Sequence, residues 1–218
     1  MGRAFPGAHV QNLYGLSETS GACVMSAADD DLATVCETLG TALSGVQIRV
    51  VDPGTGAEVP DGEDGELQVR GDCVAAGYWE MPDATAETFR EGWLATGDMV
   101  TRRSDGHLVL RGRRKEMFLQ GGFNVYPVEV ENVLAAHPGV ALAAGIGVPD
   151  DVLGEVGLYF VVPADPASPP TAGELTAWCR ERLADYKVPR RFEIRAELPT
   201  TPAGKIAKAE LRREVVSA

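Results

Sequence analysis

Apolar and polar side chains alternate in several short segments of the first half of the chain. Val46–Val51 alternates and then becomes continuously apolar, and Glu66–Arg70 alternates again after a run of turn-forming residues. Both patterns are typical of half-buried strands. Met99–Arg103 and His107–Arg111 flank the turn sequence at 104–106, which indicates a hairpin. The first half is therefore predicted to form a small, twisted antiparallel sheet.

The second half combines helical and strand patterns. Pro127 suits the first position of a helix, and Val130 and Leu134 then lie on one face of it. Thr171 and Glu174 form a capping box that opens a second helix. The remaining predicted elements are strands at Val140–Val148, Val156–Val162 and Arg191–Ile194 and a helix at Lys208–Val216. The sequence thus predicts an α+β fold: a small antiparallel β-rich subdomain followed by a compact α+β C-terminal domain.

The net charge of −12 is carried by the first half alone. Residues 1–110 hold 6 Lys and Arg against 18 Asp and Glu, whereas residues 111–218 hold 14 of each. An acidic chain is disfavoured as a partner of nucleic acid or of an anionic membrane. The change in composition also indicates two structural units.

Four cations stand within the five residues Arg111–Lys115, where the two compositions meet. Such a segment is a poor candidate for a core, so it is interpreted either as a solvated linker or as a hinge. We predict a first domain over residues 1–111, a hinge at 112–115 and a second domain over residues 116–218.

The 4 cysteines are widely spaced and have no C-x-x-C pair or matching histidines, so neither a disulfide framework nor a zinc site is expected. They are interpreted as reduced and mostly buried thiols. No apolar run approaches the roughly 20 residues that a membrane helix needs. The first six residues lack the apolar stretch of a signal peptide. We therefore expect a cytoplasmic protein without a membrane span.

The first of four chemically suggestive segments is Asn12–Thr19. Tyr14 offers a stacking face, and Gly15 allows a close approach to the backbone. Ser17 can donate a hydrogen bond to a phosphate oxygen, and the Glu18 carboxylate can bind Mg²⁺. The alternative is a loop in which the same residues cap a following helix.

Two further segments place single charged side chains next to glycine. Asp98 follows a glycine between apolar segments, so its carboxylate suits either a grip on two ribose hydroxyls or an ordinary turn. Leu198–Lys208 places Lys205 on an exposed loop after a proline-containing turn. This loop lacks the glycine spacing and the hydroxyl of a Walker A phosphate loop, and a charged surface loop is the alternative for it.

The fourth segment, Gly112–Glu131, is long and therefore much more specific. Its glycine pair, Gly121 and Gly122, allows another group to approach the backbone closely. The four segments together, in this order and with these separations, resemble the adenylate-forming superfamily. That superfamily includes acyl-CoA synthetases, the adenylation domains of peptide synthetases and beetle luciferases. The resemblance extends over nearly the whole chain, from His9 to Arg213.

The resemblance implies an acid–thiol ligase that activates a carboxylic acid with ATP and Mg²⁺ and passes it from AMP to coenzyme A. In its nucleotide site, Tyr14 stacks on adenine with Gly15 beside it. Ser17 contacts the α-phosphate, and Glu18 binds Mg²⁺. Asp98 binds the ribose hydroxyls.

The resemblance implies further roles around and beyond the predicted hinge. Arg113 also binds the ribose, and Lys115 occupies the hinge position. Lys205 is the catalytic lysine, which contacts both the carboxylate and the α-phosphate during adenylation. After a rotation of the small domain, Gly121 and Gly122 face the pantetheine channel.

Two features depart from the superfamily pattern. Some relatives carry a lysine implicated in the thioester step where this chain has Leu119 and Gln120, so these two residues are not assigned that role. The superfamily's Thr/Ser/Gly-rich phosphate loop and most of its acyl pocket are expected before the first motif, where this sequence has no such segment. The chain is interpreted as the C-terminal part of a longer enzyme, with little or no ligase activity by itself.

Three functional hypotheses remain open. The first is an acyl-CoA synthetase, because the run from Gly121 to Pro127 most resembles ligases of fatty, alicyclic and aromatic acids. The second is an adenylation domain that loads a carrier protein. The third is a non-catalytic binding or assembly module that self-associates through the surface its missing part would cover.

Overall fold

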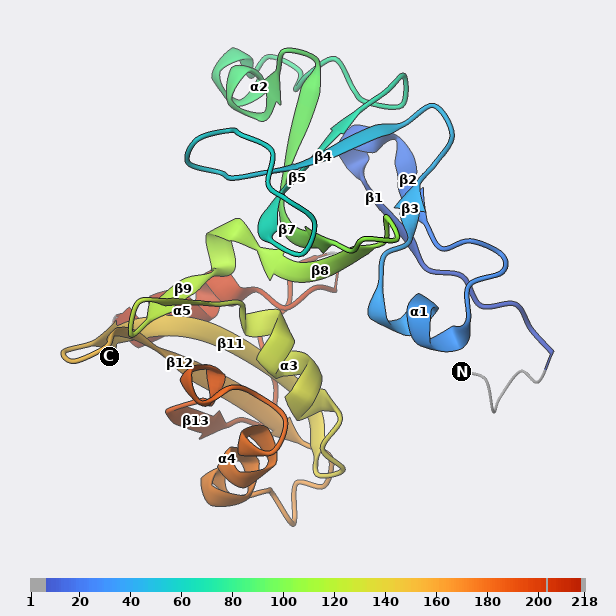
Figure 1. Cartoon of the computed structure of the whole chain (residues 1–218). Helices are drawn as coiled ribbons and strands as arrows, with labels where there is room; N and C mark the ends of the chain where they lie inside the picture. The colour runs from blue at the N-terminus through green and yellow to red at the C-terminus, as the bar shows by residue number, and fades with distance from the viewer. Residues whose placement is uncertain (1–6, 203, 217–218) are drawn as a thin grey trace. The chain divides into compact units, whose positions relative to one another are not determined.

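A computed structural model describes residues 7–202 and 204–216 of the chain. The chain divides into two units, Met1–Arg114 and Lys115–Ala218, and Figure 1 labels the helices and strands of each. The first six residues, on which the expectation of no signal peptide rests, lie outside the described residues. Within the described part of the chain, no helix is long and apolar enough to cross a membrane.

The first unit contains two antiparallel sheets. One has the order β1-β2-β3, and the other has the order β4-β5-β7-β6 with β8 paired to β7. The strands are β1 (Leu13–Leu16), β2 (Gly21–Met25), β3 (Thr41–Ala42), β4 (Gln47–Val51), β5 (Asp64–Arg70), β6 (Phe89–Arg90), β7 (Trp93–Arg102) and β8 (Leu108–Arg113). The helices are the 3₁₀ turn η1 (Ser17–Thr19), α1 (Leu32–Glu37) and α2 (Pro82–Thr88), and the 3₁₀ turn η2 (Arg114–Glu116) follows β8. The predicted antiparallel β-rich subdomain is confirmed.

The core of the first unit forms because alternate residues of its strands turn inward. Leu67 and Val69 of β5 are fully buried, and Val50 of β4 and Val100 of β7 belong to the same cluster. The two segments predicted as strands from their alternation form β4 and β5, which pair with each other. Burial of one face therefore fixes the register, since a slip by one residue would expose the whole set.

The predicted hairpin around residues 104–106 joins β7 to β8. β7 begins at Trp93, well before the expected start at Met99, because the residues between them stay within the sheet as an irregularity. The cationic segment also differs from a solvated linker at its beginning. Arg111 and Arg113 belong to β8, and Gly112 between them is buried.

The second unit is built on one sheet of order β10-β9-β12-β11, with β13 paired parallel to β12. Its strands are β9 (Phe118–Gln120), β10 (Phe123–Val125), β11 (Val140–Asp150), β12 (Gly154–Pro163) and β13 (Arg191–Ile194). Its helices are α3 (Pro127–Ala135), α4 (Ala172–Arg180), the 3₁₀ turn η3 (Asp185–Lys187) and α5 (Lys208–Val216). The predicted α+β domain is confirmed, and β11, β12, β13, α3, α4 and α5 overlap the predicted segments, whereas β9, β10 and η3 were not predicted.

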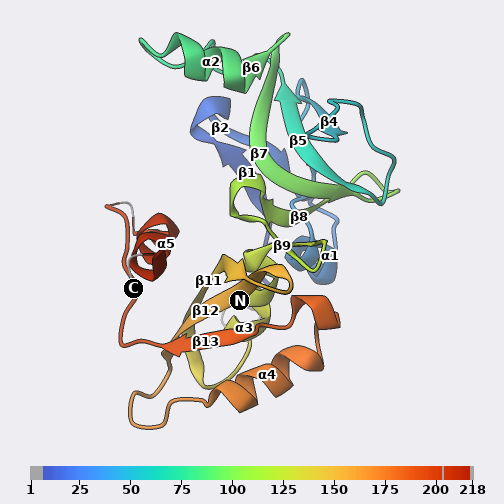
Figure 2. The ribbon, with the colours of Figure 1, turned by 90° about the vertical axis from the view of Figure 1, so that its left-hand side faces the viewer.

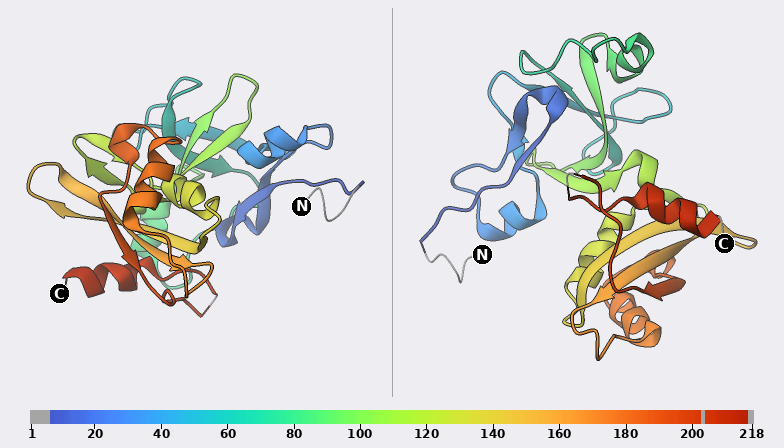
Figure 3. Two further views of the ribbon diagram at one scale, coloured as in Figure 1. Left: turned by 90° about the horizontal axis from the view of Figure 1, so that it is seen from below. Right: turned by 180° about the vertical axis from the view of Figure 1, so that it is seen from behind.

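Each face of this sheet carries its own core. Tyr159 of β12 is buried in a cluster with residues of α3 and α4, whereas the next residue, Phe160, is buried in a cluster with Leu211 of α5. The helices accordingly lie on opposite sides of β11 and β12, α3 and α4 on one and α5 on the other (Figures 2 and 3). A strand covered on both faces reads as a continuous apolar run, which explains the pattern at 156–162.

Local sequence signals account for the helix ends. α3 has Pro127 at its first position, where the missing N–H costs nothing. α4 begins with the predicted capping box: the Glu174 amide donates to the Thr171 hydroxyl, and the Glu174 carboxylate accepts from the Thr171 amide. Both helices turn a buried side toward β11 and β12, with Val130 and Leu134 on α3 and Leu175 on α4.

The cysteines are free, but only two of the four are buried. Cys23 and Cys179 are buried, Cys73 is half-buried and Cys36 is exposed. Burial raises the pKa of the Cys179 thiol to about 11 and also raises the pKa of the Cys23 thiol. The expectation of mostly buried thiols is therefore wrong for Cys36, which lies on the short, solvent-facing helix α1.

We expect alkylation of the folded chain at pH 8 to modify Cys36 first and to spare Cys23 and Cys179. A thiol with a pKa near 11 is about 0.1% thiolate at this pH, and the thiolate is the reacting form. Peptide mapping by mass spectrometry after brief exposure to iodoacetamide measures the order of modification. Unfolding in urea is the control, and rapid modification of Cys179 without denaturant would contradict the burial described here.

We expect Gly145→Ala to destabilise the second unit by about 1–3 kcal/mol, the cost of overpacking a core. A β-carbon at residue 145 would lie 2.2 Å from the ring of Tyr159, the buried residue opposite it on β12. The matched control is Gly173→Ala on exposed α4, where the nearest atom would be 3.9 Å away and alanine favours the helix. Thermal unfolding measures both, and equal stability of the two variants would contradict the prediction.

Candidate functional site

An irregularity in the second sheet presents Asp98. Glu66 of β5 pairs with Met99 of β7, and Gln68 pairs with Ala95, so the intervening residues of β7 lie outside the regular ladder. The side chain of Thr96 replaces the missing bonds: its hydroxyl donates to the Leu67 carbonyl and accepts from the Asp98 amide. Bulges of this kind redirect a side chain at functional sites.

The Asp98 carboxylate is nearly excluded from solvent, with its side chain 5% exposed. The Tyr14 hydroxyl donates to Oδ2 at 2.7 Å, and Arg113 Nε lies 2.7 Å from Oδ1. Arg113 stands directly opposite Asp98 on β8, whereas Tyr14 comes from β1 in the other sheet. The carboxylate therefore links both sheets of the first unit, and a buried charge needs such partners.

Tyr14 keeps its proton in this arrangement. Burial and the neighbouring Asp98 charge raise the pKa of the Tyr14 hydroxyl far above its ordinary value. It therefore acts as a hydrogen-bond donor to the carboxylate at any physiological pH. The ring packs against the apolar core of the first unit, so its position is fixed by packing as well as by the hydrogen bond.

The β1–β2 hairpin itself requires a glycine at position 15. A β-carbon at this position would lie 1.8 Å from the carbonyl oxygen of Gly21 on β2, where β1 and β2 also lose their regular register. The sequence prediction of a close backbone approach at Gly15 thus has a structural explanation within the hairpin. Binding of a ligand at this glycine stays a prediction.

Ser17 and Glu18 lie in the 3₁₀ turn that joins β1 to β2. Ser17 is exposed, and Glu18 is half-buried. The Glu18 carboxylate accepts a hydrogen bond from the Tyr78 hydroxyl at 2.7 Å, and its carbonyl accepts from the Ala75 amide. This hydrogen bond also raises the pKa of the Tyr78 hydroxyl. Tyr78 therefore keeps its proton and donates a hydrogen bond to the Glu18 carboxylate.

The described residues contain no group of three or more acidic, His or Cys side chains able to hold a metal by themselves. Glu18 nevertheless fits a Mg²⁺ ligand, since Mg²⁺ is commonly bound by one or two carboxylates together with substrate phosphates and water. One of its oxygens accepts from Tyr78, which orients the carboxylate.

In the second unit, Gly121 and Gly122 form the two-residue turn of the β9–β10 hairpin. Both have positive φ, +60° and +85°, as a type I′ turn demands and as few residues other than Gly, Asn and Asp accept. Leu119 beside the turn is half exposed. Gln120 is buried, and its side chain bonds the Gly157 amide and the Tyr186 carbonyl. Gln120 therefore holds the hairpin in place.

Lys205 projects from a closed turn of the second unit. The Thr201 amide donates to the Lys205 carbonyl at 2.7 Å, and the Lys205 amide donates to the Thr201 hydroxyl at 3.2 Å. Ile206, the next residue, packs against the core beneath α5. The lysine side chain is exposed, and its backbone bonds Thr201 at both its carbonyl and its amide. Lys115 is also exposed and is the first residue of this unit.

The structure brings together Tyr14, Asp98 and Arg113, and it places Glu18 against Tyr78. Sequence reasoning missed Tyr78, which lies 60 residues after Glu18. It also missed Thr96 and the buried Glu66, whose carboxylate accepts from the Gly97 amide. Alternation along β5 places Glu66 on the face opposite the core residues Leu67 and Val69, so no pattern in the sequence marked it as buried.

Two family models match the chain. The AMP-binding enzyme model covers residues 1–79, and the AMP-binding enzyme C-terminal domain model covers residues 129–205. The first match contains the segment of Tyr14 and Glu18, and the second ends at Lys205.

Named relatives agree with both models. The chain is 47% identical to a feruloyl-CoA synthase of an Amycolatopsis species over 206 residues, 92% of this chain and 40% of the relative. It is 43% identical to a long-chain-fatty-acid–CoA ligase of Yersinia pestis over 210 residues, 96% of this chain and 36% of the relative. The chain thus spans about two fifths of the length of these curated relatives.

A solved structure extends the similarity to the fold. The o-succinylbenzoate CoA synthetase of Bacillus subtilis, in complex with its acyl-adenylate intermediate, has a TM-score of 0.88 and 33% identity, over 94% of this chain and 41% of that one. The same synthetase is also known in complex with ATP and magnesium ion. On its motifs, its two family models and its fold, the chain belongs to the adenylate-forming superfamily of AMP-binding enzymes.

Proposed function

We propose that this chain is the C-terminal part of an ATP-dependent acyl-CoA synthetase that works in the cytoplasm. A carboxylate attacks the α-phosphorus of ATP, which forms acyl-AMP and releases pyrophosphate. The thiol of coenzyme A then attacks the acyl carbon and displaces AMP. The proposal is supported by relatives that are CoA ligases of aromatic, fatty and succinylbenzoic acids.

The observation that carries the proposal is the buried Asp98 carboxylate between Tyr14 and Arg113. A carboxylate accepts about four hydrogen bonds, so a carboxylate held in this way suits a grip on the two hydroxyls of a ribose. Arg113 is 44% exposed and pairs with Asp98 through Nε, so its guanidinium also suits a contact to the sugar. Tyr14, whose ring is held by the core, then supplies the face on which adenine stacks.

We assign the phosphate end of the nucleotide to the turn after β1. The exposed Ser17 hydroxyl suits a contact to the α-phosphate, and the Glu18 carboxylate, oriented by Tyr78, suits Mg²⁺. When bound, Mg²⁺ neutralises charge on the phosphates and on the departing pyrophosphate.

We assign catalysis of adenylation to Lys205. The attack brings a carboxylate and a phosphate together, and a cation placed between them relieves the repulsion and stabilises the transition state. The closed turn at Thr201 fixes the backbone of the lysine, and the side chain is exposed. This role needs a lysine whose backbone is anchored by hydrogen bonds and whose ammonium group can reach the reacting carboxylate and phosphate.

For the thiol step, we assign the Gly121–Gly122 turn to the pantetheine arm of coenzyme A. Its two positive-φ glycines carry no side chains that would block a ligand. We also keep Lys115 as the hinge, at the first residue of the second unit. A rotation there would exchange the Lys205 turn for the glycine turn between the two half-reactions.

We expect the isolated chain to bind Mg·ATP saturably, and Asp98→Asn to weaken this binding at least about tenfold. Asparagine keeps the shape but loses the charged acceptor, and a hydrogen bond to a charged group contributes about 1.5–3 kcal/mol. Isothermal titration measures the affinity. Asp29→Ala, an exposed aspartate of the same unit, is the control. Unchanged affinity in a normally melting Asp98→Asn protein would refute the ribose assignment.

We expect the pure chain to form no acyl-CoA from ferulate or a fatty acid with Mg·ATP and coenzyme A. The superfamily's phosphate loop and acyl pocket are not found in this sequence, so the carboxylate has no place to be oriented. Chromatography of the reaction mixture with mass detection measures the product. Product formation that disappears in Lys205→Ala would show that the chain is sufficient by itself, and it would support the lysine assignment.

A further inference from the structure

Glu66 is a buried acid that the proposed reaction does not use. It lies on β5, its side chain is 5% exposed, and its backbone pairs with Met99 of β7. Burial of an ionised carboxylate costs several kcal/mol unless partners hold it. Glu66 lies on the face of β5 opposite the core residues Leu67 and Val69 and is nevertheless buried, so its burial needs a specific explanation.

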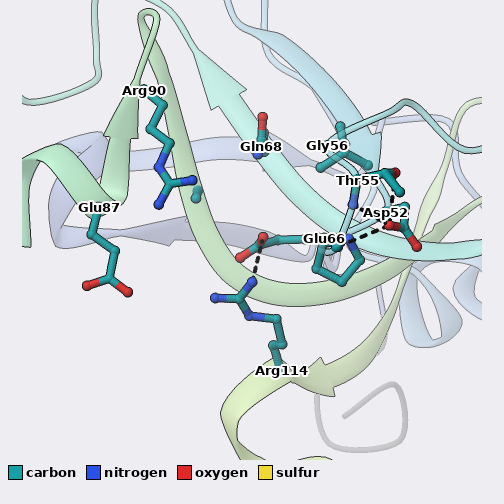
Figure 4. A pocket seen from close by; sticks show the side chains of 12 residues that line it. Asp52, Thr55, Gly56, Glu66, Gln68, Glu87, Arg90 and Arg114 are labelled. Atoms are coloured by element: carbon teal, nitrogen blue, oxygen red, sulfur yellow. Dashed lines mark hydrogen bonds and ion pairs between the residues drawn. The ribbon is translucent and has the colours of Figure 1, made fainter.

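The two oxygens of Glu66 contact two different elements. Oε1 accepts the amide hydrogen of Gly97 at 3.1 Å, and Oε2 lies 3.5 Å from Arg114 Nη1. Figure 4 shows the side chains of Glu66 and Arg114 pointing toward each other. They line a hollow of about 220 Å³, which the turn at Asp52–Gly56 and Gln68 also line. The carboxylate therefore contacts the irregular part of β7 and the first residue of η2, directly after β8, at once.

Each contact lies one residue away from the ribose-binding pair. Gly97 precedes Asp98, and its φ of +72° belongs to the bulge. Arg114 follows Arg113, the cross-strand partner of Asp98. In the bulge, the Gly97 amide lacks a ladder partner, and Glu66 supplies its acceptor. Thr96 supplies the acceptor for the Asp98 amide in the same way.

We propose that Glu66 is a positioning residue for nucleotide binding: it locks the Thr96–Asp98 bulge through the Gly97 amide and so sets the direction of the Asp98 carboxylate. Without this acceptor, the bulge loses one of the two side-chain acceptors that hold its amides, which loosens the backbone that carries Asp98. The inference rests on the proposed function, in which Asp98 grips the ribose. A misplacement of about 1 Å in such a grip costs up to about a hundredfold.

The decisive variant is Glu66→Met, which keeps the length of the side chain and removes both acceptors. Glu66→Gln keeps an acceptor for Gly97 and removes the charge. Gln68→Ala is the matched control, since Gln68 lines the same hollow but its side chain bonds Arg49 rather than the bulge. Each protein is titrated with Mg·ATP and with Mg·2′,3′-dideoxy-ATP, which lacks the hydroxyls that Asp98 would hold.

We expect Glu66→Met to lose about tenfold or more in affinity for ATP and to bind dideoxy-ATP as the unmodified chain does. Glu66→Gln and Gln68→Ala should keep the preference for ATP. An equal loss for both nucleotides in Glu66→Met would reduce Glu66 to a general structural role and overturn the proposal. So would an unchanged preference for ATP.

A second measurement separates this proposal from the proposed function. Amide hydrogen exchange of the ligand-free chain reports on Gly97 directly, and we expect exchange there to rise at least about tenfold in Glu66→Met but not in Gln68→Ala. The amide of Val109, in the regular β7–β8 ladder, is the internal control. If the unmodified chain binds neither nucleotide, the proposed function fails, and Gly97 exchange alone decides: faster exchange supports the lock, and unchanged exchange overturns it.

Discussion

A carboxylate that is almost out of reach of water organises the first unit. Asp98 accepts from the Tyr14 hydroxyl and faces the Arg113 guanidinium, both at 2.7 Å. Because a buried charge without partners costs several kcal/mol, the sheet that carries Tyr14 and the strand that carries Arg113 have to meet at this point. The same demand that holds the two sheets together also fixes the position of this carboxylate.

The sheet is irregular at the point where it presents the Asp98 carboxylate. Between Glu66 and Gln68 of β5, the opposite strand holds an irregular stretch whose amides are satisfied by the side chains of Glu66 and Thr96. Side-chain acceptors in place of ladder bonds keep every amide partnered while the backbone turns. A site on a rigid strand, held by neighbours that do not touch the ligand, is more precise than a site on a loop.

The second unit uses the opposite strategy. Its sheet is buried on both faces, by α3 and α4 on one and by α5 on the other, and its candidate groups stand on short turns outside the cores. The glycine turn at 121–122 and the turn that carries Lys205 are both closed by backbone bonds. Exposed groups on turns closed by backbone hydrogen bonds suit a unit that we propose to present first the Lys205 turn and then the glycine turn to a substrate.

The sequence by itself determined the type and order of the elements, because each signal is local. Alternation predicted β4 and β5, Pro127 and the Thr171 capping box predicted the starts of α3 and α4, and the four motifs identified the superfamily.

Only the tertiary structure decided what surrounds the candidate groups. Tyr78 lies 60 residues from Glu18, and Tyr14 lies 84 residues from Asp98, so no local pattern links them. For the same reason, Gly112 and Arg113, which the sequence left open as part of a solvated linker or a hinge, belong to β8, since pairing with β7 outweighs the local preference of charged residues for solvent. Spacing along a chain specifies strands and turns, but the partners of a buried charge are chosen by strand register and sheet packing.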